Sequence, residues 1–265
     1  MILILFTILL WIIILDNLLL GIFLLIKAYQ VKFKNLYSLG IAFVLFFVGL
    51  FGNFIFGFGY FFQEIFTSVA YFLIAIFTFL TFHTKKEGSQ AKQIIFLVLI
   101  LIIVRNILGL IYKIDINPPV RYLERIVLTC YMYIIFFWLG WSSLSTFKRL
   151  SKREIAPWIK LRYKLISIVS FLWPFHVIMA PFVPWDTEFG DPSNLISMIQ
   201  FIITVTFSLI FIIGMTIAWI IPEKLKNYLN RRKGYQLLDD RDLTEDELMK
   251  LIKDELSVPN NHGND

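Results

Sequence analysis

Long apolar runs alternate with short polar segments along most of this 265-residue chain. A helix that crosses a membrane needs about 20 mostly apolar residues, because about 30 Å of hydrocarbon is covered at a rise of about 1.5 Å per residue. Seven runs approach or exceed that length, at residues 2–26, 38–60, 65–83, 93–112, 123–145, 165–184 and 194–221. The pattern predicts an all-α, polytopic membrane protein with seven transmembrane helices. The second and third runs meet at Gln63 and Glu64, where we expect a tight turn.

Basic residues collect on alternate sides of these predicted spans. The loop 148–164 alone contains seven lysines and arginines, whereas the last loop on the opposite side contains Asp186, Glu188 and Asp191. Positively charged loops are retained on the cytoplasmic side of a membrane. We therefore expect an N-terminus outside, a cytoplasmic C-terminus and a multi-pass location in the cell membrane. A cleaved leader would leave six spans instead, but Met1 enters apolar sequence without the basic start of a signal peptide.

Composition supports a membrane class. Hydrophobic residues make up 58% of the chain and charged residues 17%, which is unlike an average soluble domain. The net charge of +6 comes from the same basic loops, so it indicates topology and not nucleic-acid binding. The expected partners are the lipid bilayer and, at the cytoplasmic face, anionic lipid. The single cysteine, Cys130, cannot form an internal disulfide.

The motifs of several enzyme classes are missing from the sequence. No lysine lies inside a predicted span, and no zinc-binding His-Glu-x-x-His, nucleophile elbow or phosphate-binding loop is present. We expect no enzymatic activity, no cofactor and no metal site.

The chain divides at the end of the seventh run. Residues 1–221 form the predicted seven-helix domain, and residues 222–265 form a cytoplasmic tail with a basic juxtamembrane segment. Thr244 and Glu247 make a capping box at the start of a predicted amphipathic helix, 245–256, and the end of the tail is predicted to be disordered. So short a helix is marginal alone, so it should dock on the basic loop or on a cytoplasmic protein partner.

Polar residues inside the predicted spans suggest a binding site. Ionisable side chains within a membrane are costly and usually have a partner, and Asp16 and Arg105 lie at depths that differ by about 7 Å. They form an ion pair if the first and fourth spans are neighbours, either as a structural clamp or as part of a functional site. Most other in-span polarity maps to the outer half of the bundle, where the predicted ligand-binding residues are Arg105, Asn106, Arg125, His176, Gln200 and Thr204.

An outward-facing cavity with two arginines favours a small anionic ligand. The alternative is that Arg125 reaches the outer headgroups while threonine hydroxyls bond their own helix. On the second span, Gly49, Asn53 and Gly57 recur every four residues, a small-polar-small pattern typical of close helix packing.

The segment Pro157-Trp158-Ile159-Lys160-Leu161-Arg162-Tyr163 resembles uncharacterised seven-span membrane proteins of archaea. The overall plan also resembles the seven-helix sensor modules of histidine kinases. That resemblance is architectural, and it implies a separate output protein because the tail is too short for a kinase domain. From the predicted outer cavity we expect a receptor-like or sensor-like protein, in which a small ligand from outside shifts a helix-bundle equilibrium that is read by the basic loop and tail. The alternatives are a transporter or channel, and an assembly or scaffold subunit.

Overall fold

The computed structural model describes residues 2–83, 88–152, 156–187 and 189–232, and these residues form helices joined by short connections. Its helices are α1 (Ile2–Val31), α2 (Lys34–Phe56), α3 (Tyr60–Phe82), α4 (Gly88–Ile114), α5 (Pro118–Ser151), α6 (Pro157–Leu172), η1 (Trp173–Val177), η2 (Ala180–Phe182), α7 (Leu195–Trp219) and α8 (Glu223–Arg232). Within this part of the chain, seven helical segments are long and apolar enough to span a membrane. The prediction of an all-α chain with seven such segments is confirmed.

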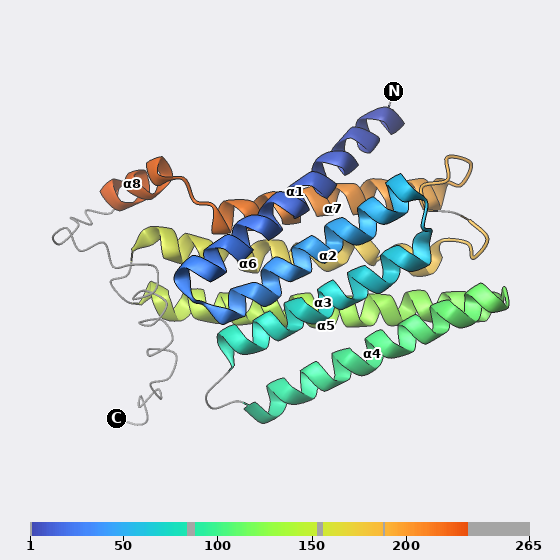
Figure 1. Cartoon of the computed structure of the whole chain (residues 1–265), viewed down its shortest axis with the longest axis horizontal. Helices are drawn as coiled ribbons and strands as arrows, with labels where there is room; N and C mark the ends of the chain where they lie inside the picture. The colour runs from blue at the N-terminus through green and yellow to red at the C-terminus, as the bar shows by residue number, and fades with distance from the viewer. Residues whose placement is uncertain (1, 84–87, 153–155, 188, 233–265) are drawn as a thin grey trace.

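Six of the seven long segments form a ring, and α4 packs outside it. Around the ring, α1 packs against α2 and α7, α3 against α2 and α5, and α6 against α5 and α7. Helix α4 contacts α3 and α5 and lies at one edge of the bundle (Figure 1). The N-terminus lies at one end of the bundle and α8 lies at the opposite end (Figure 1). Which end faces the outside stays a prediction.

The turn between α2 and α3 is at residues 57–59, before the predicted position at Gln63 and Glu64. Gly57 ends α2 with φ +64°, and Gly59 precedes α3 with φ +86°. Glycine adopts this left-handed region without the steric cost of a Cβ atom, so the two glycines stop one helix and start the next. Glu64 therefore lies inside α3, where it is 5% exposed.

Of the three residues in the predicted packing stripe on α2, two lie against α3. A Cβ on Gly49 would lie 3.1 Å from the Gln63 carbonyl oxygen, and Asn53 donates a 2.7 Å hydrogen bond to the Gln63 side chain. Both residues hold α2 close to α3. A Cβ on Gly57 would meet no neighbouring group within 4 Å, and this residue is the C-cap of α2.

The sixth span is broken in the middle. Helix α6 ends at Leu172, and the chain continues through the 3₁₀ turns η1 and η2. Pro174, Pro181 and Pro184 lie in or beside these turns, and proline removes the backbone N–H that an α-helix requires. The break lets some backbone carbonyls in this segment, among them those of His176 and Val183, accept hydrogen bonds from side chains of other helices.

The half of the bundle nearest α8 is filled with large apolar side chains. The most deeply buried of them include Phe43, Phe77, Leu139, Met215 and Trp219. Helices approach closely here, since a Cβ on Gly214 would overlap the side chain of Val169 on α6. The basic juxtamembrane segment forms α8, which packs against α6. The predicted helix 245–256 lies outside the described residues.

Candidate functional site

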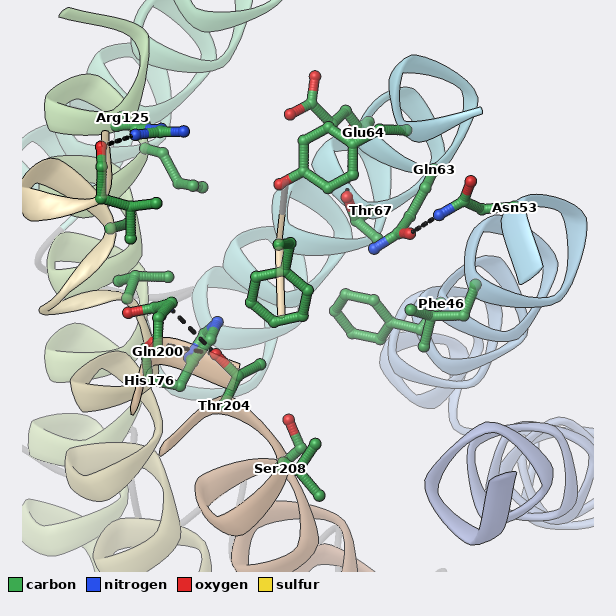
Figure 2. A pocket seen from close by; sticks show the side chains of 18 of the residues that line it. Phe46, Asn53, Gln63, Glu64, Thr67, Arg125, His176, Gln200, Thr204 and Ser208 are labelled. Atoms are coloured by element: carbon green, nitrogen blue, oxygen red, sulfur yellow. Dashed lines mark hydrogen bonds between the residues drawn. The ribbon is translucent and has the colours of Figure 1, made fainter. Parts of the chain in front are cut away.

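A cavity of about 630 Å³ occupies the other half of the bundle (Figure 2). Its lining residues come from the first halves of α3 and α5, the second halves of α2 and α4, the middle of α1, residues 200–212 of α7, and the broken part of span six with the segment after it. Most of these parts lie toward the end of the bundle where the N-terminus lies. The sequence predicts that this end faces the outside of the cell.

One wall of the cavity contains a buried ionic cluster centred on Arg105. Its Nη2 atom lies 2.6 Å from Glu64 Oε1, and its Nε donates a 2.8 Å hydrogen bond to Glu124 Oε1. Its Nη1 also donates to the Ser68 hydroxyl at 3.1 Å. On the far side, Arg121 Nη1 bonds Glu124 Oε2 at 2.8 Å. Arg105 thus joins the peripheral helix α4 to both α3 and α5.

The predicted pair of Asp16 with Arg105 is wrong. The carboxylate partners of Arg105 are Glu64 and Glu124, and Asp16 accepts a 3.1 Å hydrogen bond from Thr216 on α7. The physical reason is the helix order: α1 packs against α2 and α7, whereas α4 packs against α3 and α5. Asp16 and Arg105 have similar predicted depths, but the helices that carry them do not pack against each other.

Sequence reasoning missed Glu64 and Glu124 as members of the site. Glu64 is the first charged residue after a long uncharged run, and this position predicts a turn. However, Ser68 and Tyr71 follow Glu64 at helical spacing. Glu64 and Tyr71 line the cavity, and Ser68 bonds Arg105 in the ionic cluster. Starting the third span at the glycines would have placed Glu64 one turn inside a helix, which is the signal that could have found it.

Arg125 also lines the cavity, but its guanidinium is occupied by backbone. It donates to the carbonyl oxygens of Val183 and Pro184, just after the broken segment. These contacts differ from the alternative in which the Arg125 side chain extends to the outer headgroups.

The wall opposite the ionic cluster is built from η1 and α7. Gln200 Nε2 donates to the carbonyl oxygen of His176 at 2.6 Å and to the Thr204 hydroxyl at 3.1 Å. Thr204 is 3.3 Å from the same carbonyl, and His176 Nδ1 donates to the Trp173 carbonyl at 2.6 Å. Figure 2 shows His176, Gln200 and Thr204 together, facing Phe46 and Thr67 across the cavity. Three predicted site residues are therefore brought together.

Asn106 does not line the cavity. Its side-chain amide bonds the carbonyl of Ile102 on its own helix at 2.8 Å. It follows Arg105 directly, and neighbouring helical residues point about 100° apart, so only one of the two can face α3 and α5. Of the six predicted ligand-binding residues, the structure places five on the cavity wall: Arg105, Arg125, His176, Gln200 and Thr204.

The segment between the broken span and α7 covers part of the cavity. Trp185, Thr187 and Phe189 belong to the lining, and the Tyr112 hydroxyl donates to the Trp185 carbonyl at 3.2 Å. Beyond it, hydrogen bonds from the Ser193 hydroxyl and backbone N–H lower the pKa of Asp191 below its ordinary value. The carboxylate thereby orders the turn that leads into α7.

No protein family, curated protein or solved structure matches this chain. The resemblances to archaeal seven-span proteins and to kinase sensor modules stay predictions.

Proposed function

We propose that this chain is an integral protein of the cell membrane that acts as a receptor or sensor, binding a small ligand in the cavity. The observation that carries the proposal is the cavity itself. Its volume of about 630 Å³ falls in the usual range for small-molecule sites. Its walls combine aromatic side chains with a few fixed polar groups, as such sites do.

The broken span supplies a means of reading out the ligand. Residues 173–184 are held to the bundle by side chains that also line the cavity: Gln200 and Thr204 bond the His176 carbonyl, and Arg125 bonds the Val183 carbonyl. A ligand that changes these contacts favours a different arrangement of the segment. Because the segment continues into α6, and α6 packs against α8, the change would reach the opposite end of the bundle.

A transporter is the second candidate, and the broken span is the observation that favours it. Discontinuous helices at the centre of a bundle build substrate sites in many transporters. Transport also needs a route through the half packed with Phe43, Phe77 and Trp219. Flux of a bound ligand into liposomes would favour this candidate, whereas binding without flux favours a receptor. The third alternative, a scaffold subunit, does not require a cavity of this kind.

The proposal is tested by ligand-induced stabilisation. Purified protein in lipid nanodiscs is screened against a library of small molecules by thermal unfolding, because a ligand at about 100 times its Kd adds about 2.7 kcal/mol to the stability of the folded state. Ser208→Phe fills the cavity from α7, and Ile213→Phe places the same ring on the exposed face of that helix.

The expected result is a stabilising compound whose effect persists in Ile213→Phe and disappears in Ser208→Phe. A library without any stabilising compound would contradict the proposal. So would stabilisation that is equal in both variants, because the compound would then bind elsewhere.

A further inference from the structure

The formal charges around the cavity cancel. Three arginines line it, and so do three acids: Glu64, Glu124 and Asp186. Arg105 is committed to Glu64 and Glu124, and Arg125 to backbone carbonyls. An anionic ligand at Arg105 would have to displace a buried carboxylate, and one at Arg125 would have to displace a carbonyl. The third arginine, Arg121, is already paired with Glu124 through its Nη1 atom. The balance of charge therefore favours an uncharged ligand over the anion that the two in-span arginines suggested.

Gln200 presents a hydrogen-bond acceptor with a fixed orientation. Its Nε2 atom donates to the His176 carbonyl, and a carbonyl can only accept, so the amide cannot be flipped. The other end, Oε1, is buried and has no hydrogen-bond donor among the described residues, while the whole side chain is only 5% exposed. A buried acceptor without a donor is unfavourable, and a ligand donor at this point would satisfy it.

The rest of the lining is suited to an apolar body. Large hydrophobic side chains from several helices surround the same space as Gln200; they include Ile13, Phe46, Leu128, Val205 and Phe211. Trp173 packs against Phe211 with ring centroids 4.6 Å apart and ring planes tilted by 33°, which makes this part of the wall aromatic. Such a wall gains free energy by excluding water from apolar groups and offers no compensation for a charge.

On the basis of the proposed function, we propose that the ligand is an uncharged, largely apolar alcohol whose hydroxyl donates a hydrogen bond to Gln200 Oε1. The hydroxyl supplies the missing donor, and the hydrocarbon part packs against the aromatic and aliphatic wall. An uncharged ligand suits a lining in which three arginines and three acids balance one another.

Three probes of nearly equal size separate the chemical requirements. Decanol has a hydroxyl donor, nonyl methyl ether is its isomer without a donor, and decanoate is the corresponding anion. Binding to the full chain in nanodiscs of zwitterionic lipid is measured by the concentration dependence of thermal unfolding. Each probe is also measured in Gln200→Leu and in Gln93→Leu, which makes the same change on the exposed face of α4 and so controls for partition into the lipid.

Decanol is expected to bind about tenfold more tightly than the ether, because the ether leaves the Gln200 acceptor unpaired. This preference should vanish in Gln200→Leu and persist in Gln93→Leu. The comparison of decanol with the ether in the unchanged protein needs no variant, so it stands even if Gln200→Leu does not fold.

Equal binding of decanol and the ether, or tighter binding of decanoate, would overturn the inference about ligand class. Absence of binding by all three probes would overturn it as well. In each of these cases the cavity could still bind another compound from the wider library. The proposed function fails separately, when that library contains no molecule whose effect depends on Ser208.

Discussion

Removal of Arg105 tests the central contact of the site. In Arg105→Met the side chain keeps much of its length and loses its charge, so Glu64 is left in a buried position with its nearest cation gone. Glu124 keeps Arg121 at 2.8 Å, whereas the distance from Arg121 to Glu64 is 4.0 Å. The loss should therefore fall mainly on Glu64.

The expected size follows from the buried geometry. Opposite charges about 4 Å apart attract by about 4 kcal/mol at an effective dielectric constant of about 20. Removing one member of a buried pair costs about 3–5 kcal/mol, because the other charge stays buried without compensation. Arg105→Met should lower the free energy of unfolding by about that amount. Adding Glu64→Gln removes the stranded charge, so the double variant should be less destabilised than the sum of the single variants by about 1–3 kcal/mol.

The assay is reversible unfolding of the purified protein by detergent titration in bicelles, analysed as a double-mutant cycle. Asp16→Asn is the matched control, because it also neutralises an intramembrane acid, but one that bonds Thr216. Its effect should add to that of Arg105→Met within about 0.5 kcal/mol. Coupling between Arg105 and Asp16, together with additivity between Arg105 and Glu64, would refute the helix order on which the site is built.

Three further predictions concern the fold. Gly214→Ala should destabilise the protein by about 1–3 kcal/mol in thermal unfolding, because the new methyl group overlaps the Val169 side chain. The control Gly109→Ala should be at least as stable as the unchanged protein, because its new methyl group would lie 3.5 Å from the nearest atom. Gly57→Ala should cost about 1–2 kcal/mol by the same measurement through backbone strain alone, and a neutral effect would contradict its left-handed conformation. Reporter tags at the two ends, in a Cys130→Ala background, should be accessible from opposite faces of the membrane, with the N-terminal tag outside; labelling of both from one face would exclude seven crossings.

The number and approximate limits of the long helices could be predicted because they depend on local properties. An uninterrupted apolar run is compatible with a membrane only if its backbone forms a helix. The turn was placed too late, at Gln63 and Glu64, because residues 35–63 contain no charged residue that would mark the end of α2. Left-handed backbone at Gly57 and Gly59 marks the true turn.

The candidate site was predicted in part for the same reason. Depth within a span is a local quantity, so Gln200, Thr204 and His176 could be assigned to one level, and the structure brings them together. The partner of Arg105 could not be found this way, because several acids lie within its axial reach. Choosing among them requires the lateral order of the helices.

Apolar length by itself determined that the described residues include seven helical segments long enough to span a membrane, and where polar groups fall along each of them, because those features follow from a segment's own residues. Tertiary structure alone decided that α4 lies outside the ring, that Arg105 joins Glu64 and Glu124, and that a cavity remains in one half of the bundle. These features depend on the lateral packing of side chains from segments distant in the chain, and helical periodicity within one segment does not specify its neighbour.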